Sequence, residues 1–247
     1  MNALTDIARA QRKFLLFVLF CAFSWPTHFS LLAKEATAPA AKKPTGPARF
    51  EAEIAAFEKW DRQNAVPKDC ILFVGSSSIR LWQSAEAFPD LPVVNRGFGG
   101  STIPDSTHFA DRIIFKYKPR TIVFYAGDND IAAGRSPDRV VADYEAFAKS
   151  VHERLPNTRL IYLAIKPSPR RWKMWPQAQI ANARIQAFIK KNDHDLYVDT
   201  AMPILGTDGE PRKELFRDDG LHMNAKGYEA WNEVLVTRLR SAASTGQ

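Results

Sequence analysis

A serine-rich turn and an Asp-x-x-His sequence are the residues of this chain that could do chemistry. Ser77 stands in a Gly-Ser-Ser-Ser turn directly after the apolar run 70–74. A serine hydroxyl is a weak nucleophile until a base takes its proton, and that base is normally a histidine oriented by a carboxylate. Asp219 and His222 fit these roles, because a separation of three residues puts both side chains on one side of a turn. The pattern predicts a Ser77 nucleophile, a His222 base and an orienting Asp219.

Acyl transfer also needs hydrogen-bond donors aimed at the oxygen that becomes negative in the tetrahedral intermediate. The sequence offers the backbone N–H of Ser77, the backbone N–H of Gly100 and the side-chain amide of Asn129. Each donor stands after a different apolar run. We therefore expect an oxyanion hole formed by Ser77, Gly100 and Asn129, and we interpret Asp128 and Asp130 as structural braces of the loop around Asn129.

Apolar runs of strand length alternate with stretches of helical period, which is typical of βαβ units and a parallel sheet. The expected strands are 70–74, 92–95, 121–125, 160–165 and 196–199, and the expected helices are 50–62, 138–155, 176–191 and 225–240. In an open parallel sheet, ligands bind outside the carboxyl ends of the strands. The chemistry-bearing turns follow those ends, so we expect them to meet at one edge of a single α/β domain over 49–247.

Taken together and in this order, the four stretches resemble the motif blocks of the SGNH hydrolases, the GDSL-type esterases and lipases. The nucleophile of that family falls on Ser77, and its oxyanion glycine and asparagine fall on Gly100 and Asn129. Its closing dyad falls on Asp219 and His222. The resemblance implies a three-layer α/β/α, flavodoxin-like fold with a five-stranded parallel sheet. It also implies an acyl-serine intermediate and no metal or organic cofactor.

The first motif block departs from the family pattern, because the usual Gly-Asp-Ser is Gly75-Ser76-Ser77 here. In the family, the aspartate helps to brace the nucleophile turn, whereas Ser76 offers only a shorter hydroxyl. The run of serines therefore leaves Ser76 and Ser78 as alternative nucleophiles, with Ser77 favoured by its place in the block.

A basic and aromatic segment, 166–175, follows the fourth expected strand. Its place in the chain predicts a position near the pocket mouth. Arg171 and Trp172 are therefore candidate substrate contacts, although packing and solubility account for such residues equally well.

The N-terminal residues have the pattern of an export signal. Basic residues within 9–13 precede the apolar run 14–23, and Ser24 follows it. A stable membrane span needs about 20 apolar residues, and this run is too short for one. We predict a signal peptide over 1–24, with Ala33 as a later cleavage position, and an exported protein, periplasmic or extracellular.

The composition limits the class of protein. Residues 25–48 are rich in Ala, Pro, Lys and Thr without hydrophobic periodicity, so we expect a flexible spacer there. The 247-residue chain is 45% hydrophobic, enough for one sizeable core, and its net charge of +7 comes without the basic block expected of a nucleic-acid-binding protein. Its two cysteines cannot form a disulfide framework, and Cys70 is expected to be unpaired.

These observations predict an exported serine hydrolase that cleaves carboxylic esters through an acyl-serine intermediate. The expected substrates are small-molecule or glycan esters that carry short acyl or acetyl groups, and the mature protein is expected to have no stable membrane span. Two alternatives stay open. One is a non-catalytic glycan-binding protein on the same fold. The other is a metal-dependent phosphoesterase using the carboxylates of 128–130 and 218–219, which is disfavoured because no Asp-x-His or His-x-His spacing occurs.

Overall fold

Five parallel strands form one sheet in the described part of the chain. They are β1 (Ile71–Gly75), β2 (Val93–Gly97), β3 (Thr121–Tyr125), β4 (Arg159–Leu163) and β5 (Leu196–Val198). The strand order is β2-β1-β3-β4-β5, and all four neighbouring pairs are parallel. The order reverses direction at β1, which is the flavodoxin-like topology. The predicted α/β fold with a five-stranded parallel sheet is therefore confirmed.

The computed structural model describes residues 45–244, with side chains through residue 240. The predicted signal peptide and the spacer up to residue 44 lie outside the described residues and stay predictions. The described chain begins with a short 3-10 helix, η1 (Gly46–Phe50), so residues 46–48 have regular structure where the sequence indicated spacer.

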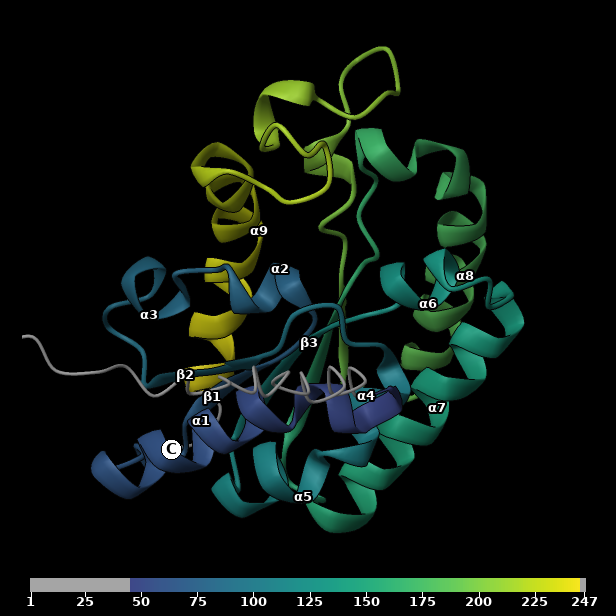
Figure 1. Ribbon diagram of the computed structural model, residues 1–247. Helices are drawn as coiled ribbons and strands as arrows, with labels where there is room; N and C mark the ends of the chain where they lie inside the picture. The colour runs from purple at the N-terminus through teal and green to yellow at the C-terminus, as the bar shows by residue number, and fades with distance from the viewer. Residues whose placement is uncertain (1–44, 245–247) are drawn as a thin grey trace, which may run out of the picture. The chain divides into compact units, whose positions relative to one another are not determined.

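Four longer helices accompany the sheet (Figure 1), and they agree with the predicted ones apart from shifts of a few residues at their ends. They are α1 (Glu51–Gln63), α7 (Pro137–Arg154), α8 (Trp175–Ile189) and α9 (Ala225–Ser244). The shorter helices are α2 (Ser77–Arg80), α3 (Ser84–Ala87), α4 (Ile103–His108), α5 (Ala110–Ile113) and α6 (Asp128–Ala132). Further 3-10 turns are η2 (Phe115–Tyr117), η3 (Pro169–Met174), η4 (Met202–Ile204) and η5 (Lys213–Leu215).

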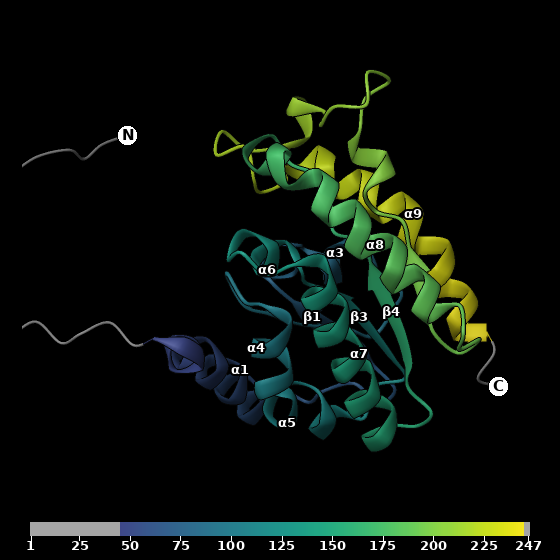
Figure 2. The same ribbon diagram turned by 90° about the vertical axis from the view of Figure 1, so that its right-hand side faces the viewer.

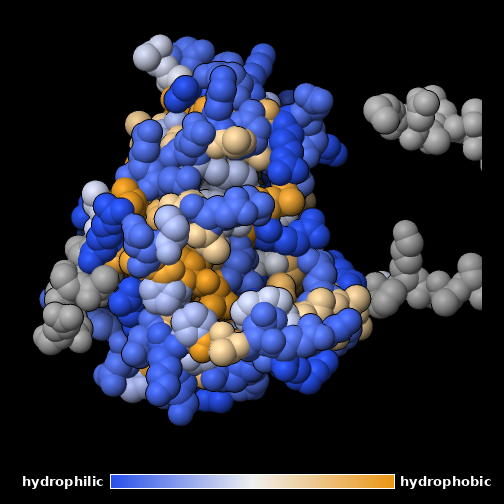
Figure 3. Space-filling view, turned by 90° about the vertical axis from the view of Figure 1, so that its left-hand side faces the viewer, coloured by the Kyte–Doolittle hydropathy of each residue, from blue (hydrophilic) through white to orange (hydrophobic). Residues whose placement is uncertain are grey.

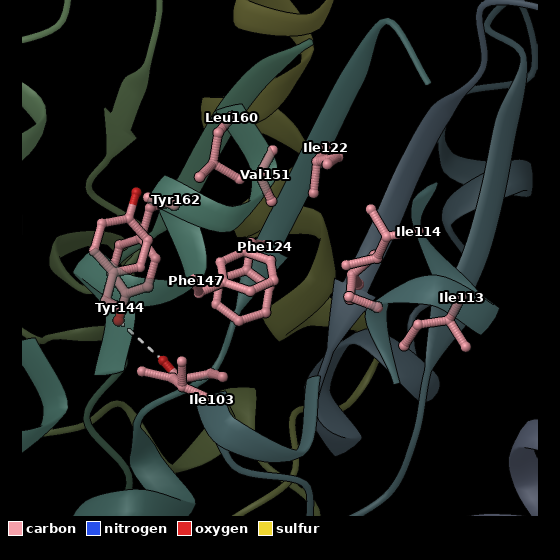
Figure 4. Close-up of a cluster of buried hydrophobic side chains, with 14 of the residues drawn as sticks. Ile103, Ile113, Ile114, Ile122, Phe124, Tyr144, Phe147, Val151, Leu160 and Tyr162 are labelled. Carbon is pink, nitrogen blue, oxygen red and sulfur yellow. Dashed lines mark hydrogen bonds between the residues drawn. The ribbon is translucent and has the colours of Figure 1, made fainter. Parts of the chain in front are cut away.

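The first core lies between the sheet and helices α1, α4, α5, α7 and α8. Phe124 of β3 stacks on Phe147 of α7, with ring centroids 4.1 Å apart (Figure 4). The buried hydroxyl of Tyr162 donates to the carbonyl oxygen of Ala126 at 2.9 Å, so this polar atom is satisfied within the apolar layer. These strands bury both faces, which is why they read as continuous apolar runs in the sequence.

The second core lies on the opposite face, where α9 packs with α2 and α3. Figure 1 shows α9 on one side of the strands and α7 and α8 on the other, and in Figure 2 α7 passes in front of the strands. Trp231 of α9 is fully buried and packs against Tyr125 of β3 and Trp82, at centroid distances of 5.1 and 5.3 Å. The three layers of the predicted α/β/α architecture are therefore present.

The register of the sheet determines where the turns after β1, β2 and β3 lie relative to one another. Gly75 at the end of β1 lies beside Gly97 at the end of β2 and Tyr125 at the end of β3. The three turns that follow these strands therefore leave the sheet at the same level. These turns contain Ser77, Gly100 and Asn129.

Strand β2 is an edge strand, and an open hollow of about 300 Å³ lies beside it. The hollow is lined in part by Phe57 of α1, by Trp82 and by Asn95. Figure 3 shows this side of the molecule, where hydrophobic residues gather near the middle of a largely hydrophilic surface. Within residues 45–244, no helix combines the length and the apolar character that a membrane span requires.

Candidate active site

The turn after β1 is built so that Ser77 emerges at the edge of the sheet. Gly75 has φ +140°, and a Cβ atom there would lie 1.9 Å from the carbonyl oxygen of Tyr125, so glycine is required. The backbone N–H of Ser76 donates to the same oxygen at 3.0 Å. Ser77 then begins α2, and its own N–H has no acceptor inside the helix because it belongs to the first turn.

Ser77, His222 and Asp219 form a continuous chain of hydrogen bonds. The Nε2 atom of His222 lies 3.0 Å from Oγ of Ser77, and its Nδ1 atom lies 2.6 Å from Oδ2 of Asp219. The other carboxylate oxygen accepts the backbone N–H groups of Leu221 at 2.8 Å and His222 at 2.9 Å. An ionised Asp219 accepts the proton on Nδ1, which leaves the lone pair of Nε2 directed at the serine hydroxyl.

The environment of Asp219 keeps its carboxylate ionised. Desolvation acts to raise the pKa of Asp219, but the hydrogen bonds from the His222 ring and from the two backbone N–H groups outweigh it. The pKa of Asp219 therefore lies well below its usual range. At neutral pH this residue is an acceptor only, as an orienting partner for histidine must be.

Among the three serines of the turn, Ser77 is the one whose hydroxyl contacts the imidazole. The Oγ atom of Ser76 is buried and has no hydrogen-bond partner. Ser78 is buried, and its carbonyl oxygen accepts the hydroxyl of Tyr228 from α9 at 2.9 Å. The geometry thus favours Ser77 over the two alternative serines.

Gly100 ends the turn after β2 with φ +78° and has open space around it. Two contacts fix the turn: Ser101 Oγ donates to the carbonyl oxygen of Phe98 at 3.0 Å, and the N–H of Gly99 donates to Glu53 of α1 at 3.2 Å. Among the described residues, the N–H of Gly100 donates to no acceptor. This N–H is therefore free to bind a ligand.

Asn129 of α6 has its side-chain amide fixed from two directions. Its Nδ2 atom donates to the carbonyl oxygen of Ser101 at 2.9 Å, which leaves one of its two hydrogens available. Its Oδ1 atom accepts Nη2 of Arg171 at 2.9 Å, while Nη1 of Arg171 pairs with Asp128 at 2.8 Å. Both terminal nitrogens of Arg171, a candidate substrate contact, thus have protein partners, and its role toward a substrate stays a prediction.

Trp172, the other expected substrate contact, is partly buried and stacks on Trp175 with ring centroids 6.3 Å apart. Its role toward a substrate stays a prediction.

Asp130 is buried and joins α6 to the start of α4. Its two carboxylate oxygens accept the N–H of Ile103 at 3.2 and 3.3 Å, and Arg135 lies 3.6 Å away. Burial raises the pKa of Asp130 to about 7, against the opposing effects of the Ile103 N–H and Arg135. These contacts fit the structural role expected of this residue.

The segment after β4 contributes contacts that the sequence analysis did not anticipate. The N–H of Arg170 donates to the carbonyl oxygen of Gly220 at 2.9 Å, and Nζ of Lys166 donates to the carbonyl oxygen of Leu221 at 2.9 Å. The sequence held one signal for the role of Lys166. It directly follows the expected strand 160–165, at the edge of the sheet where the site was expected. Among residues 45–240, no three His, Cys, Asp or Glu side chains are grouped as ligands for a metal ion.

Comparisons with known proteins identify the family of the chain. The sequence profile of the GDSL-like Lipase/Acylhydrolase family matches residues 78–230. A search of curated proteins finds no match.

Solved structures share the fold. A protein from Streptococcus pneumonia described as a platelet activating factor has a TM-score of 0.69 at 23% identity, over 76% of this chain and 92% of the other. A GDSL-like lipase from Bacteroides thetaiotaomicron has a TM-score of 0.66 at 21% identity, over 80% and 98%. A catalytic mutant of an acetylxylan esterase from Geobacillus stearothermophilus has a TM-score of 0.58 at 13% identity, over 68% and 93%.

At these identities the structural likeness shows the fold, whereas the profile match shows the family. The resemblance drawn from the motif blocks is confirmed, and the chain belongs to the GDSL-like Lipase/Acylhydrolase family.

Proposed function

We propose that this protein hydrolyses carboxylic esters through an acyl-enzyme formed on Ser77. The observation that carries the proposal is the 3.0 Å contact of Ser77 Oγ with His222 Nε2, continued by the 2.6 Å contact of His222 Nδ1 with Asp219. A hydroxyl, an imidazole and an ionised carboxylate in this sequence of contacts are the parts that nucleophilic acyl transfer requires.

In the first half of the reaction, Oγ of Ser77 attacks the ester carbonyl carbon while Nε2 of His222 takes the hydroxyl proton. The carbonyl electron pair moves onto the oxygen, which the N–H groups of Ser77 and Gly100 and the amide of Asn129 then bind. Removal of one such donor from a well-studied protease costs about 2.7–4 kcal/mol of transition-state stabilisation. The carbon–oxygen bond to the alcohol breaks, and the leaving alcohol takes the proton from His222.

In the second half, a water molecule replaces the alcohol. Nε2 of His222 takes one proton from the water as its oxygen attacks the acyl carbon. The bond to Ser77 Oγ then breaks, and the serine takes the proton back from His222. The carboxylic acid leaves, and Ser77 and His222 return to their starting protonation states.

For the substrate, we propose short acyl or acetyl esters of small alcohols or of glycans. The acetylxylan esterase among the structural neighbours supports an acetylated carbohydrate as one such class. We also propose that the protein acts outside the cytoplasm, periplasmically or extracellularly, on the basis of the basic and apolar residues within 9–24.

The test compares the full-length protein with its Ser77→Ala variant on p-nitrophenyl esters of increasing chain length and on acetylated xylo-oligosaccharides. We expect turnover of the acetyl esters by the native protein and a loss of at least about 10³-fold in the variant. A fluorophosphonate probe is expected to label the native protein at Ser77 and not the variant.

The outcomes distinguish the alternatives. Equal turnover by the Ser77→Ala variant would refute the acyl-serine mechanism. Glycan binding without turnover or labelling would favour the non-catalytic alternative, and turnover abolished by a chelator would favour the phosphoesterase alternative.

A further inference from the structure

Lys166 is a buried lysine in the segment after β4, three residues beyond the end of the strand, with 5% of its surface exposed. The chain is fixed immediately before it, because Ile165 exchanges two hydrogen bonds with the side-chain amide of Asn182 from α8. Its N–H donates to Oδ1 at 2.8 Å, and its carbonyl oxygen accepts from Nδ2 at 2.9 Å. The backbone next to Lys166 is therefore held in place by α8.

The ammonium group of Lys166 reaches the turn that carries the dyad. Nζ donates to the carbonyl oxygen of Leu221 at 2.9 Å and lies 5.3 Å from the centroid of the Phe216 ring. Leu221 stands between Asp219 and His222 in the sequence, so this bond holds the peptide group next to the histidine. Burying an ammonium is unfavourable without compensation, and this carbonyl and aromatic face supply part of it.

The side chains of the dyad on that turn are partly exposed to solvent. The side chains of Asp219 and His222 are 38% and 26% exposed. Its ties to the segment after β4 are the Lys166 bond to Leu221 and the bond from the N–H of Arg170 to the carbonyl oxygen of Gly220 at 2.9 Å. Lys166 follows β4 by three residues, and the residue before it is bonded to Asn182 of α8, so the bond from Lys166 connects the exposed turn to the packed interior of the fold.

We propose that Lys166 is a positioning residue for the hydrolase: through the Leu221 carbonyl it fixes the Asp219–His222 turn at the distance from which His222 can act on Ser77. This inference rests on the proposed function. Misplacement of a reacting group by about 1 Å can lower a rate about 10²-fold, so we expect the loss of this one anchor to be measurable.

The charges around Lys166 make its anchoring pH-dependent. Burial lowers the pKa of Lys166 to about 8, the carboxylates of Asp128 and Asp219 act to raise it, and Arg171 acts to lower it. The hydroxyl of Tyr125 faces the backbone of Lys166 and is itself kept neutral by burial. The ammonium is thus present at neutral pH and is lost as the pH rises through about 8.

The experiment replaces Lys166 by Met, which keeps most of the side-chain length and removes the cation. On p-nitrophenyl acetate at pH 7, we expect kcat to fall about 10- to 100-fold with little change in KM, because the turn is misplaced while the substrate pocket is intact. Lys173→Met is the matched control, since Lys173 is an exposed lysine of the same segment and its replacement leaves kcat unchanged.

The pH profile separates positioning from a merely structural role. The kcat of the native protein is expected to decline as the pH rises through about 8, and the Lys166→Met variant is expected to lack this decline. Lys166→Gln keeps a donor without a titrating charge, so we expect an intermediate kcat and again no decline. The Ser77→Ala variant, measured at each pH, supplies the background rate.

Folding of each variant is checked by circular dichroism and thermal melting. A folded Lys166→Met variant with native kcat, or one that retains the alkaline decline, would overturn the role of Lys166. If neither variant folds, the native profile decides, and a flat kcat between about pH 7 and 9.5 overturns the inference. Activity retained by Ser77→Ala would instead refute the proposed function, so the two failures are distinguishable.

Discussion

Arg171 donates from Nη2 to Oδ1 of Asn129 at 2.9 Å and from Nη1 to Oδ2 of Asp128 at 2.8 Å. The guanidinium spans two consecutive residues of α6 in the forked geometry that arginine offers and lysine does not. The amide oxygen of Asn129 is thereby occupied, and its nitrogen faces the carbonyl oxygen of Ser101. This pairing determines which end of the amide is presented to the site.

The first prediction concerns this pair. We expect Asn129→Ala to lower kcat about 10²–10³-fold, the loss typical of one oxyanion donor. Arg171→Met is expected to lower kcat about tenfold with KM nearly unchanged, and the double variant should lose no more than Asn129→Ala alone, because Arg171 acts through Asn129. Steady-state kinetics of the three variants check this, with the exposed neighbour Arg170→Met as control. An effect of Arg171→Met on KM alone would instead support direct substrate contact.

The second prediction concerns the orienting carboxylate. Asp219→Asn is expected to lower kcat about 10³–10⁴-fold, because an amide cannot hold the proton on Nδ1 of His222 as the ionised carboxylate does. Asp218→Asn is the matched control, since Asp218 is exposed and adjacent, and its kcat is expected to be native. A native rate in Asp219→Asn would show that His222 needs no carboxylate partner.

The third prediction separates neighbouring serines. Ser76 Oγ is buried without a hydrogen-bond partner, so Ser76→Ala removes a desolvated hydroxyl and no bond. We expect unchanged kcat and a free energy of unfolding that is unchanged or higher by about 1 kcal/mol. Thermal melting and esterase assays beside Ser77→Ala test this. Loss of activity in Ser76→Ala comparable to that of Ser77→Ala would make Ser76 a nucleophile candidate again.

The fourth prediction uses the raised pKa of Asp130, which is about 7 in the folded protein. In the unfolded chain the carboxyl titrates near its reference pKa of about 3.9. Between these values the folded state holds one proton more, so this group lowers the stability of the native protein as the pH rises from about 4 to about 7. Below about pH 4 the stabilising contribution of Asp130 is fully present, and above about pH 7 it is fully lost.

Asp130→Asn keeps the neutral acceptor for the Ile103 N–H and does not titrate. The Tm of this variant, relative to the native Tm, is therefore expected to rise between pH 4 and 7. Each kcal/mol of difference corresponds to about 2–4 °C for a domain of this size. Thermal melting of both proteins across this pH range checks the sign, and a constant difference in Tm would show that Asp130 is ionised throughout.

The sheet and the dyad could be predicted from the sequence because their signals are local. Strands such as β3 are continuous apolar runs, and Ser77, Asn129 and His222 stand in short motifs whose order matches a known family. The register of the sheet then places the motifs, since Gly75, Gly97 and Tyr125 lie side by side.

The contacts of Lys166 and Arg171 could not be predicted, because they depend on where one loop lies against two others. Lys166 stands in a segment with three other basic residues, and such a composition predicts solvent-exposed side chains. Only the fold shows that Lys166 is buried. The short helices α2 to α6 could not be predicted either. They have four to six residues each, which is too few for a helical period to be recognised in the sequence.

The hydroxyl of Ser77 and the imidazole of His222 meet across a sequence separation of 145 residues. A chain emerging from the ribosome, or one cut short before the last turn, holds the serine and its N–H donors but neither the imidazole nor the carboxylate. Its serine is then as unreactive as any on a protein surface. Reactivity toward esters is therefore a property of the finished polypeptide, and its appearance during refolding would report that the two ends of the domain have come together.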